Sequence, residues 1–249
     1  MVEFNNLNSE KPYQLFKEKY DEALSAGQKV IEAISISSYN RELNEVHSRY
    51  VNLKFIKLNQ EKPYQLFKEK YDDAVNAGQK FIEAISISSY NNELSEVDSR
   101  FVNLKFISND EFIFFSNYNS PKALSFNSHD QIAALLYWPS INVQIRIRAK
   151  IKRTTDEFNQ KYFFDRSEEK NALAISSNQS KPIDSYNRVR ENYNKSLKND
   201  DLKECPKYWG GYSFKPYEIE FWEGNEFRLN KRNLYTKDNT GWNHFILEP

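Results

Sequence analysis

Residues 208–232 read YWGGYSFKPYEIEFWEGNEFRLNKR, and the pattern within them is typical of a sheet protein. Apolar and polar residues alternate over Tyr217–Trp222 and again over Glu226–Tyr235, as they do in strands with one buried face. Glu223-Gly224-Asn225 lies between these segments and contains the glycine that a tight turn favours. The segment therefore predicts a β-hairpin. On its second strand, one face is expected to carry Arg228, Asn230 and Arg232.

The residues before this hairpin predict further short strands separated by helices. The clearest strand is Ile141–Lys152, in which apolar residues alternate with basic and polar residues. Glu111–Ser116 and Gln131–Trp138 are two more expected strands. Helices are expected from Thr155, around Glu168–Ile175 and over about Asp184–Lys198. Many short antiparallel strands with few helices indicate a small closed β-barrel with helical excursions, in the mostly-β or α+β class.

The first hundred residues contain an internal repeat. Glu10–Ile56 recurs as Glu61–Ile107 with eight substitutions, 51 residues further along the chain. Each copy predicts a helix followed by two strands, and in the second copy Pro63 lies in the first helical turn while Gly78 ends the helix. Because the second copy runs directly into the following strands, we expect this copy to be built into the barrel.

The repeat suggests a division of the chain into two parts. Residues 1–57 form the duplicated helix–hairpin segment, and residues 58–249 form the barrel domain. The simplest interpretation of the first copy is a partial duplication that adds a spare helix and hairpin, since two copies are too few for a solenoid. The alternatives are that both copies compete for one place in the sheet, or that the first copy pairs with another subunit.

The composition argues against several classes of protein. Lys and Arg together number 35, as do Asp and Glu, so no excess positive charge is present to recruit nucleic acid. The basic face of Ile141–Lys152 is accordingly interpreted as a solvated strand face. The longest apolar run, Ala133–Trp138, is too short to span a bilayer, and no signal-peptide pattern opens the sequence. With a single cysteine, Cys205, the chain fits a reducing compartment, and we expect a cytoplasmic protein.

Common catalytic and metal-binding motifs are missing from the sequence. The three histidines share no ligand spacing, so no metal site is expected. The six glycines form neither G-x-G-x-x-G nor a P-loop, and no G-x-S-x-G occurs. The candidates for a functional site are therefore less specific groups of residues.

Three segments carry side chains that suit a small anionic or flat ligand. Ser120-Pro121-Lys122 supplies hydroxyl and ammonium donors for a phosphate, although such loops are common for structural reasons. Arg228 and Arg232 could hold two acidic groups, or belong to a solvated strand paired with Glu218 or Glu220. Trp209, beside Gly210-Gly211, could stack on a flat ligand, although a tight bend in a barrel is the simpler interpretation. Trp222 is a second candidate for stacking, with ordinary core packing as the simpler interpretation.

In combination these segments closely resemble the pyridoxamine 5'-phosphate oxidase family. The resembling pieces are Trp209-Gly210-Gly211, Ile219-Glu220-Phe221-Trp222, Arg228-Leu229-Asn230-Lys231-Arg232 and the ending Leu247-Glu248-Pro249. The resemblance extends back in order through Arg100–Lys105, Phe115–Asn117, Ser120–Lys122, Val143-Gln144 and Lys161–Phe163. It covers about residues 62–249, and the combination is far more specific than any single piece.

The resemblance implies an FMN-binding split β-barrel that forms a homodimer, with FMN bound between the subunits. It implies oxidation of pyridoxamine or pyridoxine 5'-phosphate to pyridoxal 5'-phosphate, with O2 as acceptor and H2O2 as product. The implied partners are a second copy of the chain, a phosphorylated B6 vitamer and O2, without nucleic acid or membrane. Because the flavin would accept the hydride, the protein mainly orients the substrate, which fits the lack of a strong acid–base constellation.

Transferred onto matching positions, the resemblance assigns three roles. FMN would be held by Arg100, Lys105, Phe115, Ser116, Pro121, Lys122, Gln144, Gln179, Ser180, Trp222 and Arg232. The substrate would be bound by Lys105, Tyr162, Arg166, Lys170, Arg228 and Asn230. The expected catalytic residues are Arg228, over the pyridine ring, and Asn230. A buried dianionic phosphate needs charge-assisted donors of this kind, each worth ~1.5–3 kcal/mol.

Several positions depart from the family's pattern. Asn230 stands where the family has a histidine, and an amide cannot carry a proton. Lys170 replaces a phosphate-binding serine and could substitute for it electrostatically. Pro121 replaces an arginine and Phe115 a tyrosine, each removing a polar contact. The family's basic N-terminal segment, which can close over the substrate, is not recognisable, and the duplicated segment occupies that end.

These departures keep two other functions open. One is a flavin reductase or related oxidoreductase on the same barrel. The other is a protein that binds the flavin or the vitamer without turning it over. Reduction by NAD(P)H would indicate the first, and tight vitamer binding with negligible peroxide release would indicate the second.

Overall fold

The computed structural model describes residues 11–28, 50–51 and 54–249. The chain forms two compact units, residues 1–36 and residues 37–249. The first unit contains helix α1 (Lys11–Ser25), which is followed by Gly27 with a φ of 71°. Glycine adopts this left-handed conformation without strain, so it ends the helix as the sequence predicts. The first of the two strands expected in this copy lies outside the described residues.

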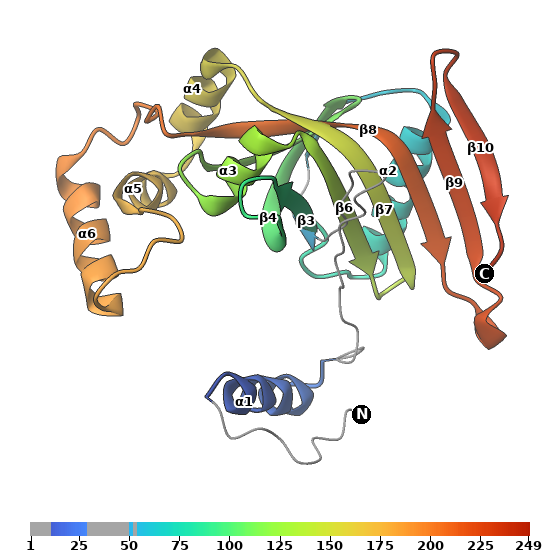
Figure 1. Cartoon of the computed structure of the whole chain (residues 1–249), viewed down its shortest axis with the longest axis horizontal. Helices are drawn as coiled ribbons and strands as arrows, with labels where there is room; N and C mark the ends of the chain where they lie inside the picture. Colours follow the sequence, from blue (N-terminus) through green and yellow to red (C-terminus); the bar gives the residue numbers. More distant parts are fainter. Residues whose placement is uncertain (1–10, 29–49, 52–53) are drawn as a thin grey trace. The chain divides into compact units, whose positions relative to one another are not determined.

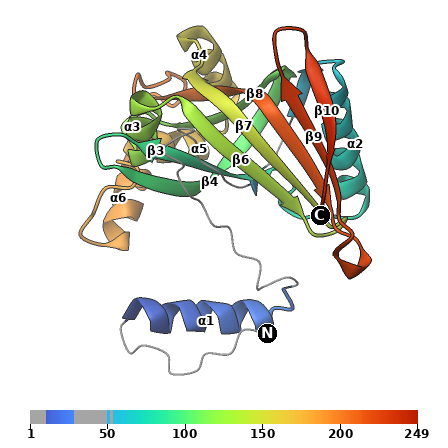
Figure 2. The same ribbon diagram turned by 45° about the vertical axis from the view of Figure 1, so that its right-hand side comes forward.

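Six antiparallel strands in the second unit close into a barrel (Figures 1 and 2). Around the barrel they are β3 (Ala84–Asn91), β6 (Gln131–Trp138), β7 (Val143–Arg153), β8 (Trp209–Glu223), β5 (Glu111–Asn117) and β4 (Glu96–Asn109). The pairing of β4 with β3 closes the circle. The predicted fold class, a closed barrel with helical excursions, is confirmed.

Four further strands extend this barrel. β9 (Lys231–Lys237) pairs with β8, and β10 (Trp242–Leu247) pairs with β9. β1 (Tyr50–Val51) pairs with the start of β3, and β2 (Lys54–Leu58) runs parallel to the end of β4. Since β1 and the first three residues of β2 belong to the first copy of the repeat, the backbone of that copy takes part in the sheet. The division at residues 57 and 58 stays a prediction, for which truncation is the test.

Helix α2 (Lys62–Asn76) covers one part of the barrel and supplies two of its large buried rings. Tyr64 and Phe67 are both fully buried. The Phe67 ring packs edge-on against Phe112 at 5.3 Å and Trp138 at 5.7 Å between centroids. Burial of one such ring contributes roughly 1.5–3 kcal/mol. The helix start at Pro63 and its end near Gly78 agree with the sequence signals.

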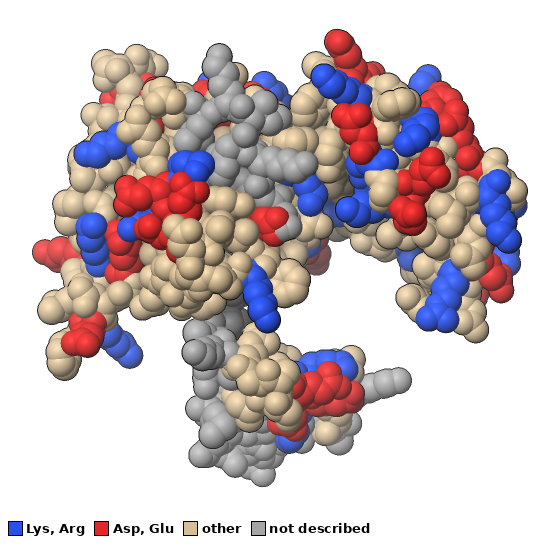
Figure 3. All heavy atoms as spheres, turned by 180° about the vertical axis from the view of Figure 1, so that it is seen from behind, with Lys and Arg blue, Asp and Glu red and all other residues tan. Residues whose placement is uncertain are grey.

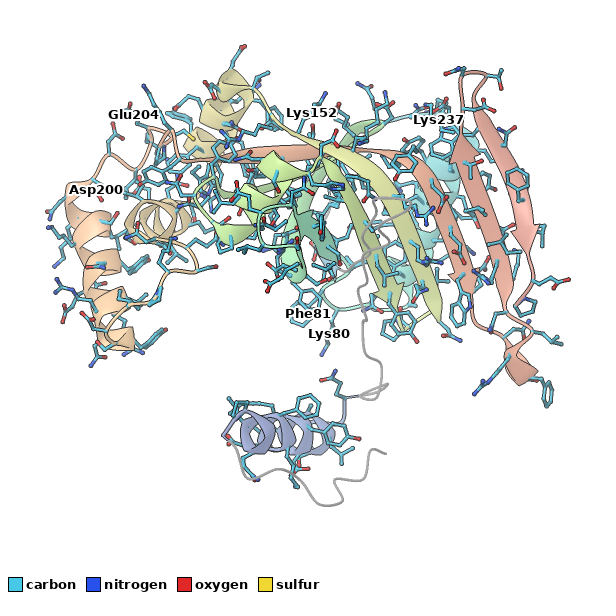
Figure 4. The ribbon with its side chains drawn as sticks, in the orientation of Figure 1. Lys80, Phe81, Lys152, Asp200, Glu204 and Lys237 are labelled. Carbon is cyan, nitrogen blue, oxygen red and sulfur yellow. The ribbon has the colours of Figure 1, made fainter. Side chains whose placement is uncertain are left out.

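The eight substitutions between the two copies avoid the core. In the second copy all eight positions are exposed: Asp73, Val75, Asn76, Phe81, Asn92, Ser95, Asp98 and Phe101. Phe81, for example, is 80 % exposed and points away from the loop before β3 (Figure 4). Every buried residue of Glu61–Ile107 has an identical counterpart in the first copy. The first copy has therefore kept the complete set of core residues.

The glycines at the start of β8 make room for side chains from neighbouring elements. A Cβ on Gly210 would overlap the Tyr118 hydroxyl and the Asn159 amide, and one on Gly211 would overlap the Thr154 hydroxyl. Asn159 Oδ1 accepts hydrogen bonds from the Gly211 amide at 2.8 Å and from the Thr154 hydroxyl at 2.6 Å. The Trp-Gly-Gly segment is thus a point of close approach within a strand.

Four helices connect the strands. α3 (Pro121–Ser128) follows β5, and α4 (Asp156–Asp165), α5 (Glu168–Ser176) and α6 (Tyr186–Asn199) lie between β7 and β8. Thr155 caps α4 by accepting a hydrogen bond from the Phe158 amide at 3.3 Å. Ser185 caps α6 in the same way, through the Arg188 amide at 3.2 Å. The helices α4, α5 and α6 each begin within two residues of the start that the sequence predicts.

The hairpin predicted at residues 217–235 needs correction. β8 begins much earlier, at Trp209, and β9 begins only at Lys231. Residues 224–230 form a loop that contains a 3₁₀ turn, Glu226–Arg228, in which Phe227 has a φ of 55° and Arg228 a φ of 62°. The expectation that Arg228, Asn230 and Arg232 alternate along one strand is wrong, because Arg228 and Asn230 lie in this loop.

Local hydrogen bonds explain why the strand does not start earlier. The Asn225 side chain accepts from the Glu226 amide at 2.7 Å, and the Asn230 side chain accepts from the Asn225 amide at 3.2 Å. These bonds satisfy backbone groups that a ladder would otherwise pair. The last strand, β10, has no counterpart in the sequence prediction. Its residues are exposed or half-buried on both faces, so they show no alternation to detect.

Candidate functional site

A buried lysine lies at the start of α3. Lys122 is 7 % exposed, and its ammonium group donates to the hydroxyls of Ser116 at 3.2 Å and Ser120 at 3.3 Å. Burial lowers the pKa of Lys122 to about 8, with a further contribution from the positive charge of Arg100. Among the described residues no carboxylate forms an ion pair with Lys122. We call this group, Lys122 with Ser116 and Ser120, the phosphate cradle.

Two further predicted residues adjoin the cradle. Arg100 on β4 donates to the Ser89 hydroxyl at 2.7 Å and forms an ion pair with Asp98. Burial lowers the pKa of Arg100, and Asp98 opposes that shift. Gln179 accepts hydrogen bonds from the Ser116 hydroxyl and the Asn117 amide, both at 3.2 Å. The structure therefore brings Arg100, Ser116, Lys122 and Gln179 together, as the resemblance implies.

A second group of predicted residues lines a cavity of about 470 Å³, which we call the anion pocket. Its lining includes the predicted substrate residues Lys105, Tyr162, Arg166 and Lys170. Burial raises the pKa of Tyr162 and lowers that of Arg166, while each of these two side chains opposes the other's shift. Three cations around one cavity, with Asp165 as the one carboxylate of its lining, favour an anionic ligand.

Stacked aromatic rings form one wall of the anion pocket. Phe115 stacks on Tyr162 at 3.9 Å and on Trp209 at 5.1 Å between centroids. The Arg166 guanidinium lies 4.6 Å from the centre of the Trp209 ring. Phe115 therefore orients Tyr162 in this structure, which the sequence did not indicate. Trp209 is 7 % exposed, so it supports an arginine from within the core instead of offering an open stacking platform.

An adjoining cavity connects the anion pocket with the cradle. It has a volume of about 360 Å³ and shares with the pocket Asn103, Phe115, Arg166, Lys170 and Trp209. It also reaches Ser116 and Gln179 of the cradle region. The two cavities thus share the aromatic residues Phe115 and Trp209 in their linings.

A third group of predicted residues lies in one row across three strands. Trp222 on β8 is paired with Gln144 on β7 and with Arg232 on β9. Arg232 donates through Nε to Glu220 at 2.8 Å and through NH1 to the Glu248 carbonyl at 3.0 Å. Glu220 is 4 % exposed and also accepts from Arg146 at 2.6 Å. The cross-strand pairing with Glu220 that was one alternative for Arg232 is therefore present.

The row and the cradle lie at opposite ends of β8. Ser116 pairs with Gly210 near the start of β8, whereas Gln144 pairs with Trp222 near its end. Gly210 and Trp222 are twelve residues apart, which corresponds to roughly 40 Å along the strand. Figure 1 shows the long course of β8 from the side of α4 and α5 to the side of β9. The cradle and the row are therefore treated as two separate groups within one chain.

The remaining predicted residues occupy loops. Arg228 is exposed in the left-handed turn, and Asn230 uses its carbonyl oxygen to close the same loop. Lys70 of α2 pairs with Glu223, the last residue of β8 before this loop, at 3.0 Å. Pro121 is the first residue of α3, and Ser180 has a φ of 66° in the segment between α5 and α6. Among the described residues, no side-chain hydrogen bond joins either of these two to the cradle.

Comparisons with known proteins identify the family to which the chain is similar. Residues 209–249 match the model of the pyridoxine 5'-phosphate oxidase C-terminal dimerisation region. The pyridoxine/pyridoxamine 5'-phosphate oxidase of Coxiella burnetii is 33 % identical over 194 residues, which cover 75 % of this chain and 95 % of that protein. A similar protein from Hydrogenovibrio crunogenus is 31 % identical, over 75 % of this chain and 88 % of its own length.

The chain belongs to the pyridoxine/pyridoxamine 5'-phosphate oxidase family. This is a family of FMN-dependent oxidoreductases, so the chain is an enzyme of that class. Among solved structures, PhzG from Burkholderia lata in complex with tetrahydrophenazine-1-carboxylic acid is similar, with a TM-score of 0.71 and 25 % identity over 76 % of this chain and 93 % of that one. An FMN-binding protein from Nostoc punctiforme shares the fold, with a TM-score of 0.62 and 12 % identity.

Two structural findings complete the description of this family member. No helix among the described residues is both long and apolar enough to cross a membrane. The described residues also contain no cluster of three His, Cys, Asp or Glu side chains placed to hold a metal ion. Figure 3 shows acidic and basic side chains interspersed on the face opposite to that of Figure 1, in line with the balanced composition.

Proposed function

We propose that the protein oxidises pyridoxine 5'-phosphate and pyridoxamine 5'-phosphate to pyridoxal 5'-phosphate, with FMN as cofactor and O2 as electron acceptor. The observation that carries the proposal is the connection between two anion-binding regions. The cradle holds a buried ammonium group without a carboxylate partner among the described residues, and the anion pocket beyond the aromatic wall holds Lys105, Arg166 and Lys170. A phosphorylated cofactor and a phosphorylated substrate need two such regions side by side.

The donors of the cradle fit the phosphate of FMN. A dianion is stabilised by charge-assisted bonds from an ammonium and a guanidinium together with hydroxyl donors, and Lys122, Arg100 and Ser116 supply these groups. Gln179 adjoins them through the Ser116 hydroxyl. When bound, the flavin supplies the hydride acceptor and passes the electrons to O2, which gives H2O2. The protein's own contribution is binding and orientation.

A second copy of the chain completes the site in this proposal. The row Gln144, Trp222 and Arg232 is too far along β8 to contact a cofactor held by the cradle of the same chain. In a two-fold dimer the row of one subunit can face the cradle of the other. The match of residues 209–249 to a dimerisation region supports this arrangement. We therefore propose a homodimer with two composite FMN sites, in a cytoplasmic setting that suits the single thiol of Cys205.

The substrate's phosphate is assigned to the anion pocket, where Arg166, Lys105 and Lys170 surround the cavity and Tyr162 provides a hydroxyl. Lys170 is exposed, so it adds charge at the entrance without a desolvation cost. Arg228 and Asn230 come from the loop that follows Glu223, the residue at the end of β8 with which Lys70 pairs. Asn230 holds no titratable proton, so its role in this proposal is to shape the loop that presents Arg228.

The direct test is an activity assay on the full-length protein. The purified protein should be yellow, and it should release H2O2 when pyridoxine 5'-phosphate is added in air. Unphosphorylated pyridoxine is the matched control and should give a much lower rate, because it cannot use the anion pocket. Flavin-loaded protein that releases no peroxide with either phosphorylated vitamer would contradict the proposed activity.

Asn230 favours two alternative functions. Its carbonyl oxygen is engaged by the Asn225 amide, and it stands where the family has a titratable histidine. A protein that binds flavin and vitamer without turnover, or a flavin reductase on the same barrel, agrees with this loss. Reduction of the bound flavin by NAD(P)H without a response to the vitamers would select the reductase, and tight pyridoxal 5'-phosphate binding without peroxide would select the binding protein.

A further inference from the structure

Arg166 is unusual among the partly buried arginines of this protein. Arg100, Arg146 and Arg232 each pair with a carboxylate. Within the described residues, no carboxylate forms an ion pair with Arg166. Burial lowers the pKa of Arg166, which shows that its charge is partly desolvated. A desolvated cation without a counterion is costly unless an anion arrives, so something else must keep this side chain in place.

The contact that fixes the Arg166 guanidinium is a neutral amide. NH1 of Arg166 donates to Oδ1 of Asn171 at 2.8 Å. The Trp209 ring also supports the guanidinium, whose central carbon lies 4.6 Å from the ring centre. The hydrogen bond to Asn171 thus occupies one N–H group of the guanidinium, and Arg166 still lines the anion pocket. This arrangement leaves the remaining donors of the fork for a ligand.

Asn171 has no freedom to turn away from Arg166. It lies in α5 and is completely buried. Its Nδ2 group donates to the carbonyl of Phe163 at 2.7 Å, at the end of α4, and to the carbonyl of Leu202 at 2.8 Å. A flipped amide would place its oxygen against these two carbonyls and its NH2 group against the guanidinium donors. The two carbonyls therefore aim Oδ1 at Arg166.

We propose that Asn171 is a positioning residue, which presets the Arg166 guanidinium for the phosphate of the ligand in the anion pocket. Preorganisation of this kind raises affinity because the ordering of a flexible arginine takes place during folding and not during binding. The role rests on the proposed function for the identity of the ligand, a phosphorylated vitamer. The geometry around Arg166 does not depend on that identity, since it requires only an anion that accepts from a guanidinium.

Asn171 also joins α4 to the segment before β8, so a structural role must be separated from a positioning role. Gln160 offers a matched control. It binds the same segment, by donating to the Lys203 carbonyl at 2.9 Å and accepting from the Cys205 amide at 2.9 Å, and no hydrogen bond joins it to Arg166. Gln160→Ala should lower stability while leaving ligand affinity unchanged.

The test is a double-mutant cycle on the full-length protein. Asn171→Ala is expected to weaken binding of pyridoxal 5'-phosphate, measured by calorimetry, on the order of tenfold, the value of one charge-assisted hydrogen bond. Arg166→Leu is expected to weaken it further. In the Arg166→Leu background, Asn171→Ala should have no additional effect on affinity. Additive losses in the cycle, or an equal loss in Gln160→Ala, would overturn the positioning role.

Inorganic phosphate as a second probe separates this inference from the proposed function. The wild-type protein should bind it, and the same non-additive cycle should appear, whether or not the vitamers are turned over. A protein that binds phosphate with this cycle but releases no peroxide supports the role of Asn171 and contradicts the oxidase activity. A protein that turns over the vitamers but shows additive losses in the cycle supports the oxidase activity and contradicts the role of Asn171. Absence of phosphate binding to the wild-type protein would overturn the role of Asn171.

Discussion

At the scale of single residues, the site is defined by cations that the described residues leave without a carboxylate partner. Lys122 in the cradle and Arg166 in the anion pocket are both partly desolvated, and each is oriented by neutral groups, hydroxyls in one case and an amide in the other. By contrast, Arg232 already has the buried Glu220 as its counterion. We therefore expect Lys122 and Arg166 to contribute most of the charge-dependent affinity for phosphate groups.

Lys122 gives a prediction for the pH dependence of cofactor binding. Its pKa of about 8 in the structure lies below the 10.5 of an ordinary lysine, chiefly because of burial. FMN binding should be strongest below pH 8 and should weaken as the pH rises through this value, because the cradle loses its ammonium charge. Fluorescence titration of FMN from pH 7 to pH 9.5 measures the effect. Lys122→Arg stays charged over this range, so an equal pH dependence in that variant would contradict the assignment.

The same pKa shift has a consequence for stability without FMN. Because the folded-state pKa is lowered, the unfolded chain binds more protons than the folded chain between pH 8 and the normal value of 10.5. Stability should therefore rise with pH across that window, and Lys122→Met should reduce the rise. Urea denaturation midpoints at several pH values would measure it.

At the scale of elements, regular alternation was enough to predict most of the barrel. β7 was predicted because apolar residues recur at every second position. The start of α4 was predicted because Thr155 is a capping residue. β10 was missed because both of its faces are exposed, and the Arg228 loop was misassigned because Asn225 and Asn230 satisfy the backbone locally. Lys122 and Arg232 were candidates from their own segments, whereas Tyr162, Arg166 and Gln179 came only through the family resemblance. Asn171 was missed because a single buried residue carries no periodic signal.

The two helices of the repeat give a prediction about equivalent residues in different environments. Phe67 on α2 is fully buried against Phe112 and Trp138, whereas its counterpart Phe16 on α1 is 63 % exposed. Phe67→Ala should destabilise the protein by about 3–5 kcal/mol, and Phe16→Ala by less than about 0.5 kcal/mol. Urea unfolding of both variants measures the difference. Equal effects would show that the first copy also fills a core position.

At the scale of the whole molecule, the boundary between the two units divides the first copy of the repeat. The unit of residues 37–249 includes β1 and β2, whose backbones extend the barrel next to β3 and β4. The first copy thus contributes backbone pairing to the sheet, although the second copy supplies the barrel strands. Short connections explain this choice, because the second copy leads directly from β4 into β5.

Two truncations test how much of the first copy the barrel needs. Removal of residues 1–36 should leave the unfolding midpoint, FMN binding and dimerisation unchanged, since it removes one complete unit. Removal of residues 1–57 should also leave FMN binding and dimerisation intact, but with lower stability, because the pairings of β1 and of most of β2 are lost. Denaturation and size-exclusion chromatography provide the measurements. An insoluble or monomeric protein after either truncation would show that the first copy is essential to the fold.

The separation of the cradle from the row along β8 leads to a complementation prediction. Lys122→Met removes the cradle's ammonium group, and Arg232→Ala removes a cation of the row, so each homodimer should bind FMN weakly. If each site combines the cradle of one subunit with the row of the other, a mixed dimer regains one intact site of its two. Random reassembly of an equal mixture should then restore about a quarter of all sites, counted by FMN titration. If both groups served one FMN within a single chain, reassembly would restore no sites, and the composite arrangement would be wrong.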